Sequence, residues 1–306
     1  MKDTVFIFSG QGTQYVGMAK ELCNKFKVVS DIFEEASDIL KLDIKKLFFQ
    51  GDLKKLTDTK NAQPAILTAG YAAYQAFIEK YGIIPSFMAG HSLGEITALT
   101  AANAIIFSDA LHIVKKRGEL MHNASEKTKG SMAAVYNLDL NKLNEICEYV
   151  TGKNKKVVVS NLNSKSQTVI SGSKEGINEA IKLIEKEDFT AIELNVSGAF
   201  HSPLMEEAAY GFNKYLKSFV FRELMIPVIS SVDGKVYQNE SIIEEKLTSQ
   251  LTQPVLWTKV IEEIMQKKPS LIIESGPKDV LTKMLKRDGI MVECFSFEKN
   301  TDFIIN

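Results

Sequence analysis

The sequence predicts an α/β protein in which a smaller α+β unit is inserted into a parallel sheet covered by helices. Three observations lead to this prediction. Apolar strand patterns alternate with helical patterns in residues 1–124, and the same alternation resumes in residues 198–306. Between them, residues 125–197 have the element order β-α-β-β-α-β. We therefore expect one subdomain made of residues 1–124 and 198–306, and a second made of residues 125–197.

The first segment begins with the apolar strand Thr4–Ser9, which Gly10-Gln11-Gly12 ends abruptly. A second short strand is expected at Ser86–Gly90, directly before a stretch rich in Ala, Leu and Thr at helical spacing. The expected helices cover about 30–40, 62–81, 92–104 and 108–125. Because strands that alternate with helices run parallel, we expect a sheet with helices on both faces.

The middle segment has shorter and more closely spaced strands. We expect strands at about 132–136, 156–160, 167–171 and 191–196, with helices at about 140–150 and 174–187. This order within about 70 residues is that of a split ferredoxin-like unit. In the last segment, strands and helices alternate again as in the first segment, with helices at about 203–219 and 255–266 and strands at about 227–231 and 271–274. We expect the final helix to begin at Pro277, since proline suits the first helical position.

The composition is that of a globular protein, with 45% hydrophobic and 25% charged residues. The 37 basic and 38 acidic residues give a net charge of -1, so nothing favours binding to nucleic acid or to an acidic membrane. No apolar run reaches the roughly 18–20 residues of a membrane span, and the N-terminal apolar run is too short for a signal peptide. The three distant cysteines argue against a disulfide framework or a thiolate metal site. We expect a soluble cytoplasmic protein.

Gly90-His91-Ser92-Leu93-Gly94 matches the G-x-S-x-G pattern of a nucleophile elbow. It lies between an expected strand and an expected helix, as the elbow of an α/β-hydrolase-like core requires. Small residues on either side let strand and helix approach, and the serine hydroxyl stands at a helix N-terminus. The alternative is a chance match in a glycine-containing loop. The flanking elements favour a nucleophilic serine.

A serine nucleophile needs a base, and the chain has four histidines. His91 is adjacent to the serine and points away from it on a sharp turn. His112 belongs to a helix face, and His122 falls at the expected end of that helix, where a cation suits the dipole. His201 lies in a loop after a strand and before a helix, where α/β proteins place their chemistry. We therefore favour His201.

Two further features suggest binding functions. Gly10-Gln11-Gly12 follows the first strand, where a backbone amide could complete an oxyanion hole with the amide of Leu93. The alternative is a phosphate-binding loop, but the sequence lacks the third glycine of that motif. Arg117 is one of only three arginines, which suggests a planar fork for a carboxylate, although it could equally be a surface residue paired with Glu119. No paired His or Cys at ligand spacing indicates a metal site.

Taken together, the motifs resemble those of the malonyl-CoA:acyl-carrier-protein transacylases and the related acyltransferases of polyketide synthases. The resemblance covers essentially the whole chain, and it rests on short motifs in a fixed order. They are GQGTQ at 10–14, QPA at 63–65, GHSLGE at 90–95, Arg117-Gly118 with Met121, NLNS at 161–164, GAFHS at 198–202, Gln250 with Pro254-Val255 and Trp257, and ESGP at 274–277. An inserted ferredoxin-like unit is also a property of that family.

The resemblance implies transfer of a malonyl group from malonyl-CoA to the phosphopantetheine thiol of an acyl carrier protein, in fatty-acid or polyketide synthesis, without cofactor or metal. Ser92 would be the nucleophile and His201 its base. The amides of Gln11 and Leu93 would hold the oxyanion, and a backbone carbonyl near Gln250 would orient the histidine.

The same resemblance assigns the substrate site. Arg117 would pair with the malonyl carboxylate, with His91 and Met121 also in the binding site. Phe200 would leave no room for an α-methyl branch, which favours malonyl over methylmalonyl.

The chain departs from the family pattern at two positions, and the first of them, Ser9, keeps an alternative open. Ser9 replaces a proline that commonly precedes GQG, and Lys278 stands where a small residue is common. The FSGQG form also occurs in acyl hydrolases that unload carrier proteins in polyketide pathways, although these usually lack the clamp arginine that is present here as Arg117. A non-catalytic carrier-docking module is a further alternative. It is disfavoured because Ser92, His201, Arg117 and Gln11 are all retained.

Overall fold

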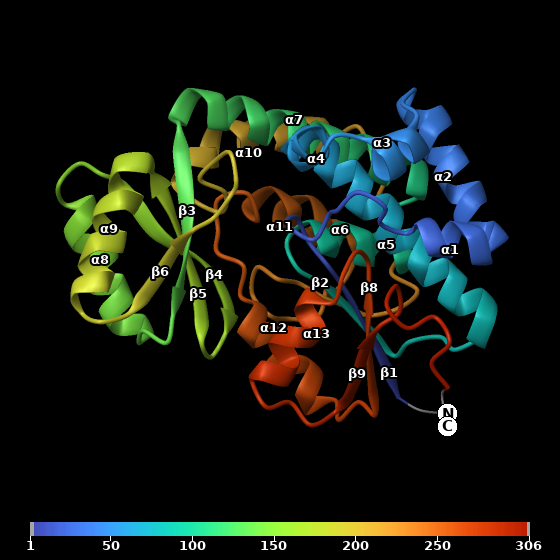
Figure 1. The fold of residues 1–306 in the computed structure, drawn as a ribbon. Coiled ribbons are helices and arrows are strands. Elements are labelled where there is room, and N and C mark those ends of the chain that lie inside the picture. Colours follow the sequence, from blue (N-terminus) through green and yellow to red (C-terminus); the bar gives the residue numbers. More distant parts are fainter. Residues whose placement is uncertain (1–2, 305–306) are drawn as a thin grey trace.

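The computed structural model describes residues 3–304 and contains two sheets in different parts of the molecule (Figure 1). The larger sheet has five strands in the order β7-β2-β1-β8-β9. They are β1 (Thr4–Phe8), β2 (Phe87–Gly90), β7 (Val228–Ile229), β8 (Leu271–Ser275) and β9 (Glu293–Ser296). All four strand pairs are parallel, so the predicted parallel sheet is confirmed.

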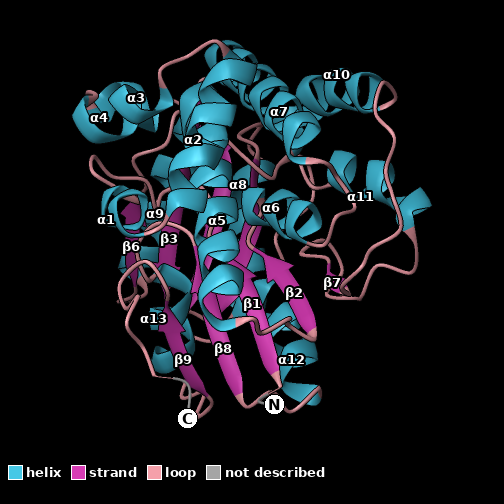
Figure 2. Ribbon diagram, turned by 90° about the vertical axis from the view of Figure 1, so that its right-hand side faces the viewer, coloured by secondary structure: helices cyan, strands magenta, loops and turns pink. Residues whose placement is uncertain are grey.

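Helices cover both faces of this sheet (Figure 2). Side chains alternate between the faces of a strand. Phe6 and Phe8 of β1 therefore pack on one side with α5 (Thr59–Tyr81), where the Phe6 and Phe77 rings meet edge to face at 5.0 Å. Val5 and Ile7 pack on the other side with α12 (Trp257–Gln266). A strand buried on both faces explains the unbroken apolar run that the sequence shows here.

The remaining helices of this part include several that the sequence did not predict. The expected helices are α2 (Lys27–Leu40), α6 (Leu93–Ala101), α7 (Phe107–Thr128) and α10 (Glu206–Leu216), the last preceded by a 3-10 turn at Pro203–Met205 within the expected range. The elements without a prediction are α1 (Lys20–Lys25), α3 (Ile44–Gln50), α4 (Leu53–Thr57), α11 (Ile243–Ser249) and a 3-10 turn at Glu240–Ile242. None of the helices within residues 3–304 combines the length and the apolar composition that crossing a membrane requires.

The smaller part is an antiparallel sheet in the order β4-β5-β3-β6, with two helices on one face. Its elements are β3 (Gly130–Tyr136), α8 (Leu140–Thr151), β4 (Val157–Ser164), β5 (Gln167–Ser173), α9 (Lys174–Lys186) and β6 (Thr190–Glu193). This is the arrangement of the predicted ferredoxin-like unit. The expected boundary at residue 125 falls inside α7, which continues to Thr128. The exact subdomain boundaries stay a prediction.

A short backbone ladder joins the two parts. The Val255 amide donates to the Ser160 carbonyl at 2.9 Å, and the Leu162 amide donates to the Val255 carbonyl at 2.9 Å. The segment just before α12 therefore lies along β4 of the smaller sheet.

The expected start of the last helix was wrong. This helix, α13, covers Val280–Arg287, and Pro277 precedes it within a turn. Gly276 and Lys278 in this turn have φ of 131° and 65°, which is incompatible with a helix. The Glu274 carboxylate accepts hydrogen bonds from the amides of Leu281 and Thr282 at 3.1 and 2.8 Å, so the helix begins where a buried side chain caps its free amides.

Candidate active site

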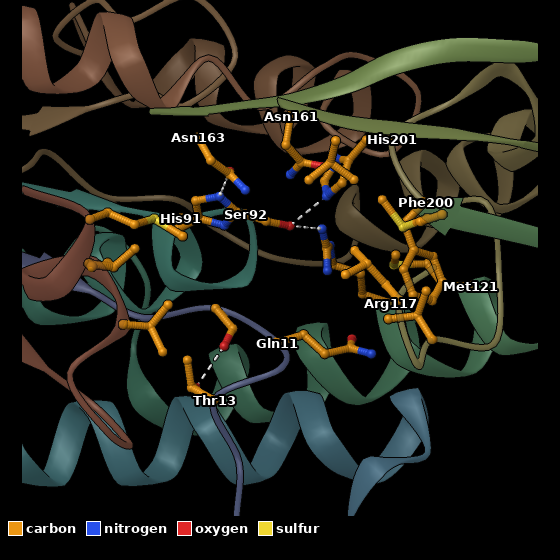
Figure 3. Close-up of a pocket in the computed structure, with 18 residues that line it drawn as sticks. Gln11, Thr13, His91, Ser92, Arg117, Met121, Asn161, Asn163, Phe200 and His201 are labelled. Atoms are coloured by element: carbon orange, nitrogen blue, oxygen red, sulfur yellow. Dashed lines mark hydrogen bonds between the residues drawn. The ribbon is translucent and has the colours of Figure 1, made fainter. Parts of the chain in front are cut away.

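A cavity of about 170 Å³ lies where β1 and β2 end, between the two parts of the molecule (Figure 3). Its walls come from the loops after β1 and β2, from α7, from the smaller sheet, from the loop before α10 and from α13. The lining residues are Gly10, Gln11, Thr13, His91, Ser92, Arg117, Met121, Met132, Asn161, Asn163, Val169, Leu194, Val196, Phe200, His201, Val280, Leu281 and Met284. Carboxyl ends of parallel strands are where α/β folds place ligands.

Ser92 stands on a strained turn between β2 and α6. Its φ of 51° and ψ of -108° are unfavourable for a residue with a side chain. The two flanking glycines make the turn possible: a Cβ on Gly90 would lie 1.9 Å from the Gly94 carbonyl carbon, and a Cβ on Gly94 would lie 2.1 Å from the Phe8 oxygen. The elbow therefore requires glycine on both sides of Ser92 for close approach of backbone.

Ser92 and His201 lie within hydrogen-bond distance. The Ser92 Oγ is 2.9 Å from the His201 Nε2, and the His201 Nδ1 is 2.7 Å from the Gln250 carbonyl oxygen (Figure 3 shows the first pair). A carbonyl oxygen only accepts, so Nδ1 carries the proton and donates to it. The Nε2 of the neutral ring is then free to accept the Ser92 hydroxyl proton.

The surroundings of His201 favour the neutral ring. Burial, with the positive charge of Arg117 as the second cause, lowers the pKa of His201 from 6.5 to about 3. The hydrogen bond to the Gln250 carbonyl acts in the opposite direction but is weaker. His201 also has a positive φ of 56°, a conformation that the loop before α10 imposes. A neutral imidazole is the form that can accept a proton.

Arg117 is buried in α7 and points at the serine (Figure 3). Its Nη2 donates to the Ser92 Oγ at 3.2 Å and to the Gln250 Oε1 at 2.8 Å, and its Nη1 donates to the Gln63 Oε1 at 2.9 Å. Burial lowers its pKa to about 10, which leaves it charged at neutral pH. The alternative of a surface residue paired with Glu119 is wrong, because Glu119 pairs with Lys116.

Of the two residues with predicted oxyanion-hole amides, Gln11 lines the cavity and Leu93 directly follows the cavity-lining Ser92. Leu93 is the first residue of α6, so its amide has no acceptor within the helix. Gln11 follows β1 and lines the cavity, and its side chain is held away by a bond from Nε2 to the Thr59 Oγ1 at 2.6 Å. The nearby turn is closed by the Thr13 hydroxyl, which donates to the Gly10 carbonyl at 2.8 Å.

The other predicted substrate residues also line this cavity. Phe200 and Met121 are both buried in its wall. His91 points away from Ser92, and its Nε2 lies 2.8 Å from the Asn163 Oδ1 on β4. Burial lowers the pKa of His91, and its ring packs edge-on against Trp257. His91 therefore connects the elbow to the smaller sheet.

The two remaining histidines lie outside the cavity. His112 is exposed on α7. His122 was expected at the end of this helix, which was wrong, because α7 continues for six more residues to Thr128. Its Nδ1 lies 3.2 Å from the Asp58 Oδ1 instead.

Several residues of the site had no role assigned from sequence. Gln63 supports Arg117 from α5, and Asn163 contacts His91 from β4. Both belong to motifs noted above, and a polar residue within an otherwise apolar helix was the available signal for Gln63. The wall formed by Val280, Leu281 and Met284 carried no signal, since apolar residues of a short helix also suit a core.

Comparison with known proteins gives consistent results. Residues 5–293 match the family model described as acyl transferase domain. The chain is 40% identical over 302 residues to a malonyl CoA-acyl carrier protein transacylase of Bacillus subtilis, covering 99% of this chain and 76% of that protein. It is 37% identical to one from Staphylococcus aureus strain MRSA252, covering 99% and 97%.

Solved structures agree over nearly the whole chain. A malonyl-CoA:acyl carrier protein transacylase from Xanthomonas oryzae has a TM-score of 0.95 and 33% identity, covering 99% of this chain and 96% of that one. A malonyl-transacylase in complex with its type II polyketide synthase acyl-carrier protein has a TM-score of 0.93 and 36% identity, covering 96% and 95%. These matches extend over both sheets and the cavity between them, and the chain belongs to the acyl transferase family that contains the malonyl CoA-acyl carrier protein transacylases.

Proposed function

We propose that the protein transfers a malonyl group from malonyl-CoA to the phosphopantetheine thiol of an acyl carrier protein, through a malonyl ester on Ser92. The observation that carries this proposal is the position of Arg117. A buried cation lies 3.2 Å from the Ser92 Oγ, inside a small cavity. An acyl group on Ser92 that ends in a carboxylate would meet this cation, whereas an uncharged acyl group would not.

The first half-reaction forms the acyl-enzyme. Ser92 Oγ attacks the thioester carbonyl of malonyl-CoA while His201 Nε2 takes the hydroxyl proton. The amides of Leu93 and Gln11 hold the negative oxygen of the tetrahedral intermediate. The carbon–sulfur bond then breaks, and His201 returns its proton to the departing thiolate, which leaves as coenzyme A.

The second half-reaction reverses these roles with a different thiol. The phosphopantetheine thiol gives its proton to His201 Nε2 and attacks the malonyl ester. The bond between the carbonyl carbon and Ser92 Oγ breaks, and His201 returns the proton to this oxygen. Both steps use only Ser92, His201 and backbone amides, so we propose a reaction without metal or redox cofactor.

The hydrolase alternative is less well supported. A cavity of about 170 Å³ suits a short acyl group, since an engineered protein cavity of about 150 Å³ binds a molecule the size of benzene. Arg117, which those hydrolases usually lack, is buried and close to Ser92. The Ser9 that raised this alternative has a buried hydroxyl without a partner among the described residues, and it does not line the cavity.

We also propose a cytoplasmic location, because all three cysteines are free.

Intact mass spectrometry tests the proposal. The protein is mixed with malonyl-CoA and then divided between holo acyl carrier protein and buffer. We expect a malonyl adduct that is stable in buffer and moves to the carrier. An adduct lost to water at the same rate with and without carrier would instead indicate a hydrolase. Carrier binding without any adduct would indicate a docking module.

A further inference from the structure

Gln250 makes contacts with both halves of the catalytic apparatus, through different atoms. Its backbone carbonyl accepts from His201 Nδ1 at 2.7 Å, as described above. Its side-chain Oε1 accepts from Arg117 Nη2 at 2.8 Å, and its side-chain Nε2 donates to the Glu95 Oε2 at 2.9 Å. All three of these side chains are buried, and so is that of Gln250.

Glu95 lies on α6, one turn after the elbow, and it is fully buried. Its Oε2 accepts from the Ser231 amide at 2.9 Å and from the Ser231 hydroxyl at 2.6 Å, and its Oε1 accepts from the Tyr237 hydroxyl at 2.6 Å. With Gln250 this makes four donors on one side chain. Four donors suit an ionised carboxylate, which accepts only.

These neighbours leave the Gln250 amide one orientation. A carboxylate only accepts and a guanidinium only donates, so the amide must turn its NH₂ toward Glu95 and its oxygen toward Arg117. The reverse orientation would place oxygen against oxygen and donor against donor. Glu95, together with the Ser92 carbonyl that accepts from the same Nε2 at 3.1 Å, therefore determines which atom of Gln250 faces the cation, although Glu95 and Arg117 share no hydrogen bond.

The indirect connection has a consequence for substrate binding. The partners of the Arg117 guanidinium are two neutral amides and Ser92, and its buried Nε has no hydrogen-bond partner in the described part of the chain. A buried cation needs compensating charge. Glu95 supplies it from behind Gln250 and also opposes the effect of burial on the pKa of Arg117. The guanidinium thus stays free of a direct carboxylate partner that would compete with an incoming one.

We propose that the Gln250 side chain positions Arg117 for the malonyl carboxylate, with Glu95 fixing its orientation, while the Gln250 backbone carbonyl independently holds His201. This inference rests on the proposed malonyl transfer. It makes Gln250 a residue that determines acyl selectivity as well as one that orients the base.

The test replaces the side chain and keeps the carbonyl. Gln250→Met has a similar length but cannot hydrogen-bond to Arg117, to Glu95 or to the Ser92 carbonyl. We expect Ser92 loading from malonyl-CoA to fall by about tenfold or more, because the clamp is no longer held in place. Loading from acetyl-CoA should fall less than loading from malonyl-CoA, because acetyl has no carboxylate for Arg117 to hold, and its pH profile should match that of the unmodified protein, since the bond to His201 persists.

Two further variants sharpen the result. Gln250→Asn keeps an amide but is one methylene too short to reach both Glu95 and Arg117, so it should show the same malonyl-specific loss and serves if the Met variant does not fold. Tyr237→Phe removes a hydrogen bond from the same Glu95 without touching Gln250, so its ratio of malonyl to acetyl loading should stay within about twofold.

The outcomes separate this inference from the proposed function. If the unmodified protein forms no malonyl adduct, the proposed function fails. If it prefers malonyl and the folded Gln250 variants keep that preference, or lose malonyl and acetyl loading equally, the positioning role is wrong. An equal loss of preference in Tyr237→Phe would also overturn it, because any damage near Glu95 would then suffice.

Discussion

Arg117 donates a hydrogen bond from Nη2 to the Oγ of Ser92 at 3.2 Å, so the nucleophile touches its base and a buried cation at once. In the absence of substrate the cation thus occupies part of the space into which an acyl group must fit. A malonyl group that replaces this contact brings its own carboxylate to the guanidinium. An acetyl group displaces the same contact but has no carboxylate to bind the guanidinium in its place.

Arg117→Ala should separate the two acyl groups. We expect malonyl loading of Ser92 to fall roughly 100-fold or more, because two hydrogen bonds to a charged group are worth about 1.5–3 kcal/mol each. Acetyl loading should change much less. Time-resolved intact mass spectrometry with malonyl-CoA and acetyl-CoA gives both rates. An equal loss for both groups would remove Arg117 from its role as a carboxylate clamp.

Ser92→Ala and His201→Ala should differ in kind. The first variant has no nucleophile, so no acyl adduct should form at any time. The second keeps the nucleophile and the oxyanion amides, and its loading rate should fall by about 10²–10⁴-fold, the usual contribution of a general base. The same mass measurement distinguishes the two. A covalent adduct that persists in Ser92→Ala would place the nucleophile elsewhere.

The loading rate should depend little on pH across the range in which histidines usually titrate. Since burial lowers the pKa of His201 to about 3, the ring stays neutral and able to accept a proton from pH 8 down to about pH 5.5. A histidine with an ordinary pKa of about 6.5 would lose roughly tenfold in neutral fraction over this range. Single-turnover loading rates measured between pH 5.5 and 8 decide the matter. A tenfold decrease at low pH would show that the ring is more exposed to solvent than this structure indicates.

Phe200→Ala should relax the acyl selectivity. Phe200 is buried in the cavity wall directly before His201, and removing its ring enlarges the space beside the acyl chain. We expect the ratio of methylmalonyl to malonyl loading to rise by about tenfold, since one methyl group in a fitted pocket is worth roughly 10–200-fold. Competition between the two thioesters in one reaction, read by adduct mass, measures this ratio. An unchanged ratio would mean that other residues of the cavity wall determine the acyl selectivity.

Glu274 should make the stability depend on pH. Burial raises the pKa of this carboxyl from 4.5 to about 7, even though two amides of α13 favour its ionised form. The folded protein thus binds a proton more tightly than the unfolded chain between about pH 4.5 and 7, so this group destabilises the fold as pH rises through that range. Glu274→Gln cannot ionise, and the unfolding free energy of the variant should lack this dependence.

The measurement is denaturant unfolding at pH 5.5 and at pH 8. The difference between the two pH values should be larger in the unmodified protein than in Glu274→Gln by about 2 kcal/mol, in favour of low pH. Comparing the variants cancels other buried carboxyls, such as Glu298. Identical pH dependence would mean that Glu274 titrates as an ordinary exposed carboxyl.

The sequence predicts the strands of both sheets except β9, and it does so for a physical reason. Val5 and Phe6 belong to a strand buried on both faces, which leaves an unbroken apolar run, and glycines follow it where the chain must turn. The missed helices α3 and α4 are short and carry little periodic signal. Their N-terminal caps, Asp43 and Asp52, each accept a backbone amide, so this capping pattern was the information available in the sequence.

The candidate site likewise contains residues that the sequence could predict and residues that it could not. Ser92 and His201 stand in local patterns, the elbow and the loop before a helix, that indicate chemistry from a few residues alone. Glu95 and Gln250 lie 155 residues apart, and their contact arises only because α6 and the segment after α11 meet in the fold. A hydrogen-bond network built on such distant positions leaves no trace in spacing or periodicity.

The backbone ladder between Val255 and β4 also concerns protein engineering. The inserted unit is covalently continuous with the larger part only at its ends, yet β4 holds a stretch of chain that begins five residues after the anchor of His201. A chimera that exchanges the insertion alone would combine a foreign β4 with the resident 250–257 segment. Exchanging both pieces together keeps the ladder matched, so the transplantable module of this enzyme is discontinuous in sequence.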